Sequence, residues 1–189
     1  MNVAYEALAG DRRTARGPIR TIEVTTGVGS GPTKLAAFDA ALRGAGVANF
    51  NLVTLSSVIP PGTDVAPVEE GASRSRGEWG DRLYVVMAEM RVDEPGEQAW
   101  AGVGWVQEPC SGKGLFAEHE GQSEAVVRHD LEASLASLAD ARPEIFGPPG
   151  YAVEGTVCGD EPACAVAVAV YGAAPWPPPA SYYPLNPLS

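Results

Sequence analysis

The chain has 189 residues, the length of one ordinary domain and enough to bury a hydrophobic core. Its 24 acidic and 13 basic side chains give a net charge of -11, which argues against binding to nucleic acid or to anionic membranes. Hydrophobic residues make up 45% and charged residues 20%, so we expect a globular protein. No apolar run is long enough to span a bilayer, and the first 20 residues lack the apolar core of a secretory signal, so we expect a cytoplasmic protein.

The cysteines and histidines are too few for a disulfide framework or a metal centre. Cys110, Cys158 and Cys164 form no C-x-x-C pair, and the histidines are His119 and His129. We therefore expect ordinary thiols and no metal.

Both ends are expected to be tails on a single domain that covers residues 1–189. Residues 1–18 are polar and show no periodicity, whereas residues 174–189 are rich in proline, which disfavours both helices and central strands. Between the tails, Glu69–Gly80 is polar and glycine-rich, and we expect it to form a loop.

Apolar patterning predicts mostly strands and two helices. The strands are expected at Thr21–Thr26, Asn51–Ser57, Arg82–Val92, Gln98–Gln107, Gly114–Glu118, Tyr151–Val157 and Ala163–Tyr171. The helices are expected at Lys34–Ala45, with Thr33 as N-cap, and at Ser123–Ala141, with Ser123 as N-cap. This pattern indicates an α+β fold, in which helices cover the outer faces of packed sheets.

Each predicted helix has an apolar stripe that should face a sheet. The stripes are Leu35, Phe38, Leu42 and Ala45 in the first helix, and Val127, Leu131, Leu135 and Leu138 in the second. Asp39 interrupts the first stripe, and a buried lone carboxylate is costly unless a cation pairs with it. Two interpretations stay open: a carboxylate at the edge of the stripe that reaches solvent or an arginine, and a carboxylate held for a cationic ligand.

Two segments near this helix could carry chemistry. Gly27–Lys34 (GVGSGPTK) is rich in glycine but lacks the Gly-Lys-Ser/Thr ending of a phosphate-binding loop, so we expect a flexible turn that leads into the helix. Further on, a β-branched strand ends in Ser56 and Ser57 and is followed by a Pro-Pro-Gly turn. No histidine stands near these serines in the sequence, and they lack the G-x-S-x-G motif of hydrolases.

Glu118 ends the predicted strand Gly114–Glu118. By alternation it shares a face with Phe116, whereas His119 points to the opposite face and is expected to be structural. A carboxyl group against apolar surface has a raised pKa and can donate a proton near neutral pH, although a strand-end acid that faces water is the alternative.

The order and spacing of several short motifs are distinctive. They are Gly29–Ser30, Thr33, Ala37–Asp39, Ala41–Leu42, Gly44–Gly46, Asn49, Asn51–Leu52, Ser56–Ser57, Pro60–Pro61, Gly114–Leu115, Glu118 and Glu120–Gly121. Together with the small-residue run Cys164–Tyr171, they resemble the pyruvoyl-dependent arginine decarboxylase family, over about Thr25 to Tyr171. The resemblance implies an α-β-β-α sandwich with mainly antiparallel sheets and two main helices.

The resemblance also implies a proenzyme that cuts itself between Ser56 and Ser57, into a β chain, 1–56, and an α chain, 57–189. In this family the second serine hydroxyl attacks the preceding carbonyl, and elimination and hydrolysis then leave a covalently bound pyruvoyl group, here derived from Ser57. Asn51 matches the family asparagine associated with that carbonyl. Neither a metal nor pyridoxal phosphate is implied.

The activity implied by the resemblance is conversion of L-arginine to agmatine and CO2 through a Schiff base. Glu118 aligns with the family's proton donor, and Asp39 aligns with the acid that contacts the substrate guanidinium. Family members are trimers with sites between neighbours, so a homotrimer or a multiple of it is implied.

Two alternatives stay open at this point. The same chemistry could act on lysine, ornithine or a biosynthetic substrate, because the sequence does not give the length of the pocket. The chain could also be an unprocessed homologue without catalytic activity, although the presence of Ser57, Asn51 and Glu118 counts against this.

Overall fold

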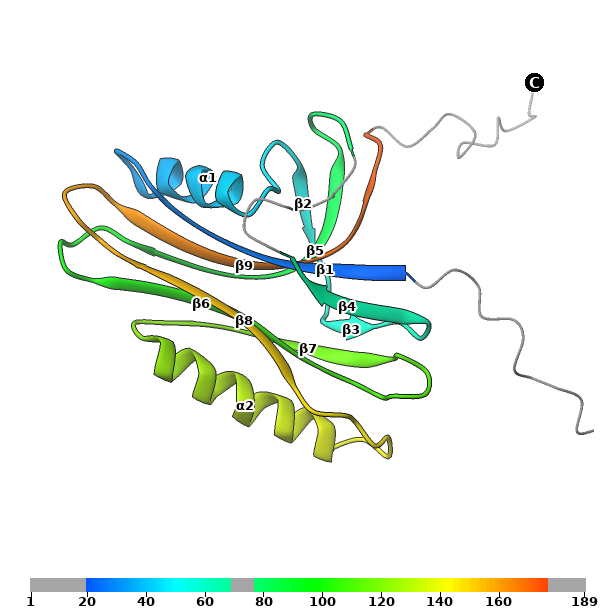
Figure 1. Ribbon diagram of the computed structural model, residues 1–189. Coiled ribbons are helices and arrows are strands. Elements are labelled where there is room, and N and C mark those ends of the chain that lie inside the picture. The colour runs from blue at the N-terminus through cyan, green and yellow to red at the C-terminus, as the bar shows by residue number, and fades with distance from the viewer. Residues whose placement is uncertain (1–19, 69–76, 177–189) are drawn as a thin grey trace, which may run out of the picture.

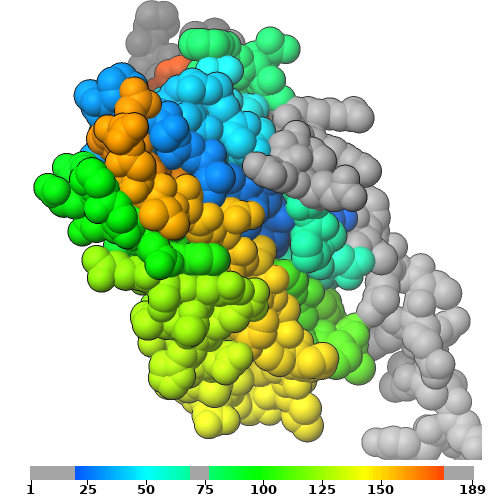
Figure 2. All heavy atoms as spheres, turned by 60° about the vertical axis from the view of Figure 1, so that its left-hand side comes forward, coloured from blue at the N-terminus to red at the C-terminus, as the bar shows by residue number. Residues whose placement is uncertain are grey.

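Two β-sheets pack face to face, and each carries one helix on its outer face (Figure 1). In the space-filling view the yellow-green atoms of α2 form the lower part of the molecule (Figure 2). The structure is a computed structural model that describes residues 20–68 and 77–176. Its elements are β1 (Arg20–Ser30), α1 (Lys34–Gly44), β2 (Asn51–Thr54), β3 (Val58–Ile59), β4 (Thr63–Pro67), β5 (Arg82–Val92), β6 (Gln98–Gln107), β7 (Gly114–Gly121), α2 (Glu124–Asp140), β8 (Gly150–Val157) and β9 (Ala163–Ala174). The predicted α+β fold, an α-β-β-α sandwich, is confirmed.

One sheet has five strands in the order β2-β5-β9-β1-β4, and the other has four in the order β3-β7-β6-β8. The pairs β1–β4 and β2–β5 are parallel, and the other paired strands are antiparallel. Three hydrophobic clusters follow from this layering: one between the sheets, one under α1 and one under α2.

The central strand β9 contributes to two of these clusters. Its residues Ala163–Val170 are all buried, as expected for a strand that is covered on both faces. Alanines 165, 167 and 169 face the other sheet, whereas Cys164 and valines 166, 168 and 170 lie under α1. Burial raises the pKa of the Cys164 thiol to about 12, so this thiol is a structural group.

The side chains of α1 that face the sheet differ from the apolar stripe that the sequence predicted. The side chains buried against the sheet are Ala37, Ala41 and Ala45, whereas Leu35 is 69% exposed. The predicted stripe is wrong for Leu35, whereas Ala45 is buried and Phe38 and Leu42 pack against the same cluster, because the close approach of the helix leaves the nearest positions to small side chains.

The close approach of α1 depends on two glycines of β1. A Cβ atom on Gly27 would collide with the backbone of Ala41 and Ala45, and one on Gly29 with the backbone of Ala41. The turn expected at 27–34 is confined to residues 31–33, since β1 continues to Ser30 and uses these glycines for packing.

The other elements lie close to their predicted positions. Strands β5 and β6 begin and end where expected, and Thr33 and Ser123 are the N-caps of the two helices. On α2, Val127, Leu131 and Leu135 are buried and Leu138 is partly buried, as predicted. The main differences are that β3 and β4 were not predicted and that β2 ends at Thr54 instead of Ser57.

Parts of three expected segments lie outside the described residues. These are the N-terminal tail, 1–18, most of the C-terminal tail, 174–189, and the larger part of the loop 69–80. Among the residues that are described, no helix is long and apolar enough to cross a membrane.

We predict that Gly29→Ala lowers the free energy of unfolding by about 1 to 3 kcal/mol, because the added methyl group must push α1 away from β1. Denaturant unfolding at fixed protein concentration measures this change. Gly159→Ala is the matched control, since a Cβ there meets nothing within 4 Å and should change stability by less than about 0.5 kcal/mol. Equal stability of the two variants would contradict the packing described for α1.

Candidate active site

The chain crosses from one sheet to the other at the serine pair. The Leu55 amide donates a hydrogen bond of 2.8 Å to the Val85 carbonyl of β5, in the five-stranded sheet. Two residues later, the Ser57 carbonyl accepts one of 2.8 Å from the Phe116 amide of β7, in the four-stranded sheet. The peptide bond between Ser56 and Ser57 therefore bridges two sheets, and the chain on each side of it is held by a different sheet (Figure 1).

Ser57 has a strained backbone. Its φ is 62°, in the left-handed region, which costs a residue with a side chain about 1 to 2 kcal/mol. Among the described non-glycine residues only Asn49 shares this feature, and asparagine tolerates it better than serine. Ser57 is kept in this conformation by the bond from Phe116 and by the pairing of Val58 with Leu115.

The hydroxyl of Ser57 is directed at a carboxylate. Its Oγ lies 2.8 Å from Oε1 and 2.9 Å from Oε2 of Glu118, so the hydroxyl donates to the carboxylate. Glu118 is half-buried on β7, where Phe116 lies in the core between the sheets and Leu115 and Ala117 face α2. The predicted alternation of this strand is confirmed. Glu118 can thus exchange a proton with an atom at residue 57.

His119 lies on the other face of β7, as predicted. Its Nε2 is 2.7 Å from the Ser134 hydroxyl on α2, so the ring links the helix to the sheet. Among the described residues no group of three or more potential ligands is placed to hold a metal ion.

Tyr171, near the end of β9, is a residue that sequence reasoning missed. Its hydroxyl donates a hydrogen bond of 2.9 Å to the Val58 carbonyl, next to Ser57. Its ring meets the Phe116 ring edge-on, with 6.0 Å between centroids. Burial raises the pKa of Tyr171, and the negative charge of Glu118 raises it further. The phenol therefore stays protonated and remains a donor at neutral pH.

Asn51 lies away from the serine pair in this chain. It begins β2, and its side-chain amide donates a hydrogen bond of 2.6 Å to the Gly80 carbonyl. Ser56 follows the other end of the strand, which at about 3.3 Å per residue places it on the order of 15 Å away. The structure does not bring this amide to the Ser56 carbonyl, and the role of Asn51 stays a prediction.

Asp39 is exposed on α1 and forms an ion pair with Arg43, one turn further on. In the single chain Asp39 fits the first of the two interpretations given above: its carboxylate reaches solvent and pairs with an arginine. Helix α1 covers the outer face of the five-stranded sheet, so this sheet separates Asp39 from β7 and Glu118 (Figure 1). The structure brings together Ser57 and Glu118, but not Asp39.

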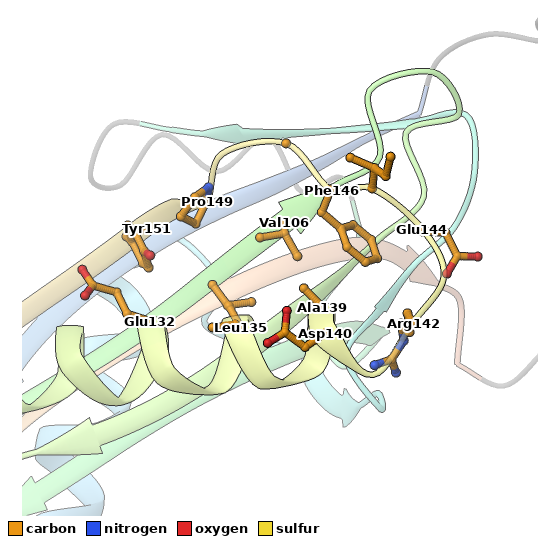
Figure 3. Close-up of a pocket in the computed structure, with 13 residues that line it drawn as sticks. Val106, Glu132, Leu135, Ala139, Asp140, Arg142, Glu144, Phe146, Pro149 and Tyr151 are labelled. Carbon is orange, nitrogen blue, oxygen red and sulfur yellow. The ribbon is translucent and has the colours of Figure 1, made fainter.

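Two grooves lie near the C-terminal end of α2. One of about 830 Å³ is lined by residues of α2, the segment 141–149 and two strands, including Val106, Leu135 and Phe146 (Figure 3). A second of about 320 Å³ extends from there to Val58 and the Pro60–Pro61 turn. Neither groove is lined by Ser57 or Glu118.

The site thus combines a strained serine that donates to a carboxylate with a peptide bond held between the two sheets of an α-β-β-α sandwich. The chain belongs to the pyruvoyl-dependent arginine decarboxylase family, whose model matches residues 21–174.

Relatives with this name include a protein of Halobacterium salinarum, 37% identical over 155 residues, which cover 80% of this chain and 93% of the relative. A protein of Archaeoglobus fulgidus, named pyruvoyl-dependent arginine decarboxylase 1, is 35% identical over 65% of this chain and 78% of its own length. One of Thermoplasma volcanium is 37% identical over 60% of this chain and 63% of its own length.

Proposed function

We propose that this protein cuts itself before Ser57 and then decarboxylates L-arginine to agmatine and CO2. The observation that carries the proposal is the contact between the strained Ser57 and Glu118. An unprocessed binding protein would have no use for a serine hydroxyl aimed at a carboxylate from a costly backbone conformation. Family membership supports the same chemistry, and the names of the relatives favour arginine over lysine or ornithine.

The cutting step uses only atoms of the chain and water. The Ser57 Oγ bonds to the carbonyl carbon of Ser56 while the amide C–N bond breaks, and the hydroxyl proton ends on the freed nitrogen. Elimination then transfers the Cα proton of residue 57 to a base and breaks its Cβ–Oγ bond, which releases a carboxylate at Ser56 and leaves a double bond between Cα and Cβ of residue 57. The Cβ atom then takes up a proton, which turns the enamine into an imine, and water hydrolyses the C=N bond, so that ammonia leaves and a ketone remains. Strain at Ser57 favours the first step, because the rearrangement relieves it.

The surroundings of residue 57 fit a pyruvoyl group. The bond from the Phe116 amide to the carbonyl of residue 57 and the bond from Tyr171 to the Val58 carbonyl both lie on the C-terminal side of the cut. They would therefore hold residue 57 after the cut. The group supplies a carbonyl that withdraws electrons during loss of CO2. Glu118 would hold a proton beside the reacting carbon and donate it once CO2 has left.

We further propose that the protein assembles as a homotrimer, or a multiple of it, with each site between neighbouring chains. Within one chain Asp39 does not reach residue 57. Leu35 lies one turn before Asp39 on the same side of α1 and is 69% exposed, which suits contact with another copy. A neighbour's Asp39 would then bind the substrate guanidinium through two charge-assisted hydrogen bonds.

The first test is the Ser57→Ala variant, which should remain a single uncut chain. The unmodified chain should give fragments of 56 and 133 residues, of which the larger resists Edman sequencing and reacts with hydrazines. Intact mass and gel analysis measure both. Ser56→Ala is the matched control and should still cut, because the cutting step uses the carbonyl and not the hydroxyl of Ser56. The proposal would be contradicted if Ser57→Ala were cut, or if the unmodified chain stayed whole on incubation.

The second test separates cutting from turnover. Glu118→Gln should still cut, since the glutamine oxygen can accept the Ser57 hydrogen bond, but its kcat should fall about 100-fold or more because the amide cannot donate a proton in the same way. Release of CO2 from arginine, lysine and ornithine measures turnover and the choice of substrate. Glu120→Gln, two residues further along β7 and exposed, is the control. Full activity of Glu118→Gln would remove Glu118 from its proposed role.

The third test concerns the shared site. Asp39→Asn should cut normally but raise KM for arginine by roughly 10- to 100-fold, because the charge that binds the guanidinium is lost. Asp93→Asn, which breaks the exposed ion pair with Lys34, is the control and should leave KM unchanged. Coexpression of Asp39→Asn with Glu118→Gln chains should restore part of the activity, since some sites then combine an intact residue from each chain. Mixed assemblies without any recovery would contradict a shared site.

A further inference from the structure

We propose that Tyr171 is a positioning residue for residue 57, before and after the cut. This inference rests on the proposed function and adds a residue that the motifs of the family resemblance did not single out. The hydroxyl of Tyr171 contacts no reacting atom in the structure. It acts through the Val58 carbonyl, which accepts its hydrogen bond of 2.9 Å.

Strand β3 needs such a partner because it is short and lies at the edge of its sheet. It has two residues, Val58 and Ile59, and among the described strands it pairs only with β7. No strand within residues 20–68 and 77–176 lies on its other side in this sheet, and Val58 itself is 57% exposed. The phenol of Tyr171 supplies a donor from that side, and it comes from β9 in the opposite sheet. Residue 57 is thus followed directly by a residue tied to both sheets.

The ring of Tyr171 supports the same segment from a second direction. It packs edge-on against Phe116, whose amide holds the Ser57 carbonyl. One side chain therefore contacts both the residue after Ser57 and the residue that binds Ser57. Because burial and Glu118 raise the pKa of Tyr171, the donor persists across the neutral range.

The importance of this contact should increase when the chain is cut. Before the cut, residue 57 is also restrained through Leu55, whose amide is bonded to Val85. The cut removes that restraint and makes residue 57 a chain terminus, and termini are poorly ordered unless they are tied down. The two-residue strand β3 and the Tyr171 hydrogen bond then hold residue 57 beside Glu118.

The test is Tyr171→Phe, which keeps the ring and removes only the hydroxyl. We expect self-cutting to slow about tenfold and kcat of the cut enzyme to fall about tenfold, with KM for arginine within about twofold of the unmodified value. The melting temperature should stay close to that of the unmodified protein. Tyr151→Phe, in β8 on the α2 side of the other sheet, is the matched control and should change neither rate.

A second measurement reports on the position of residue 57 and does not depend on enzyme activity. In the uncut Ser57→Ala background, Tyr171→Phe should speed hydrogen exchange at the Phe116 amide about tenfold, because the carbonyl of residue 57 that binds this amide is then less restrained. Exchange that is unchanged would overturn the inference. So would a variant that no longer folds, or one whose loss of kcat is matched by Tyr151→Phe.

The outcomes for this inference and for the proposed function can be told apart. Unchanged rates in Tyr171→Phe, with normal cutting and turnover by the unmodified protein, would overturn the positioning role and leave the function standing. An unmodified protein that never cuts would overturn both.

Discussion

The hydrogen bond from the Ser57 hydroxyl to Glu118 depends on how the chain passes from one sheet to the other. Leu55 is still bonded to β5 and Ser57 is already bonded to β7, so a single residue, Ser56, spans the transition. This short crossing coincides with the left-handed φ of Ser57, which directs its hydroxyl toward the carboxylate. The two packed sheets hold the two ends of this crossing apart.

Much of the fold could be predicted because its signals are local. The alternation of β7 placed Glu118 on the side of Phe116, and the helical spacing of α2 identified the residues buried under it. The position of α1 on the sheet could not be predicted from the helix alone, because it depends on Gly27 and Gly29 in β1. The large residues of α1 predicted that Leu35 faces the sheet, whereas the two glycines of β1 let the alanines of the helix make the closest contacts.

The candidate site could also be predicted only in part. Ser57 and Glu118 could be predicted because their side chains form part of recognisable motifs, and the structure places them in contact. Tyr171 could not, because it lies near the end of an apolar strand and its partner is a backbone carbonyl, which has no signature in sequence. Asn51 and Asp39 lie away from Ser57 in the single chain, where Asn51 is bonded to the Gly80 carbonyl and Asp39 pairs with Arg43.

The strand order has a consequence for how the processed protein could be recovered after denaturation. A cut after Ser56 would leave β1, α1 and β2 on the smaller piece, with β1 between β9 and β4 and β2 beside β5, all three from the larger piece. The five-stranded sheet would then be built from the strands of two polypeptides, with β1 of the smaller piece between two strands of the larger one. Unfolding would release them, and reassembly would become a bimolecular reaction whose rate depends on concentration.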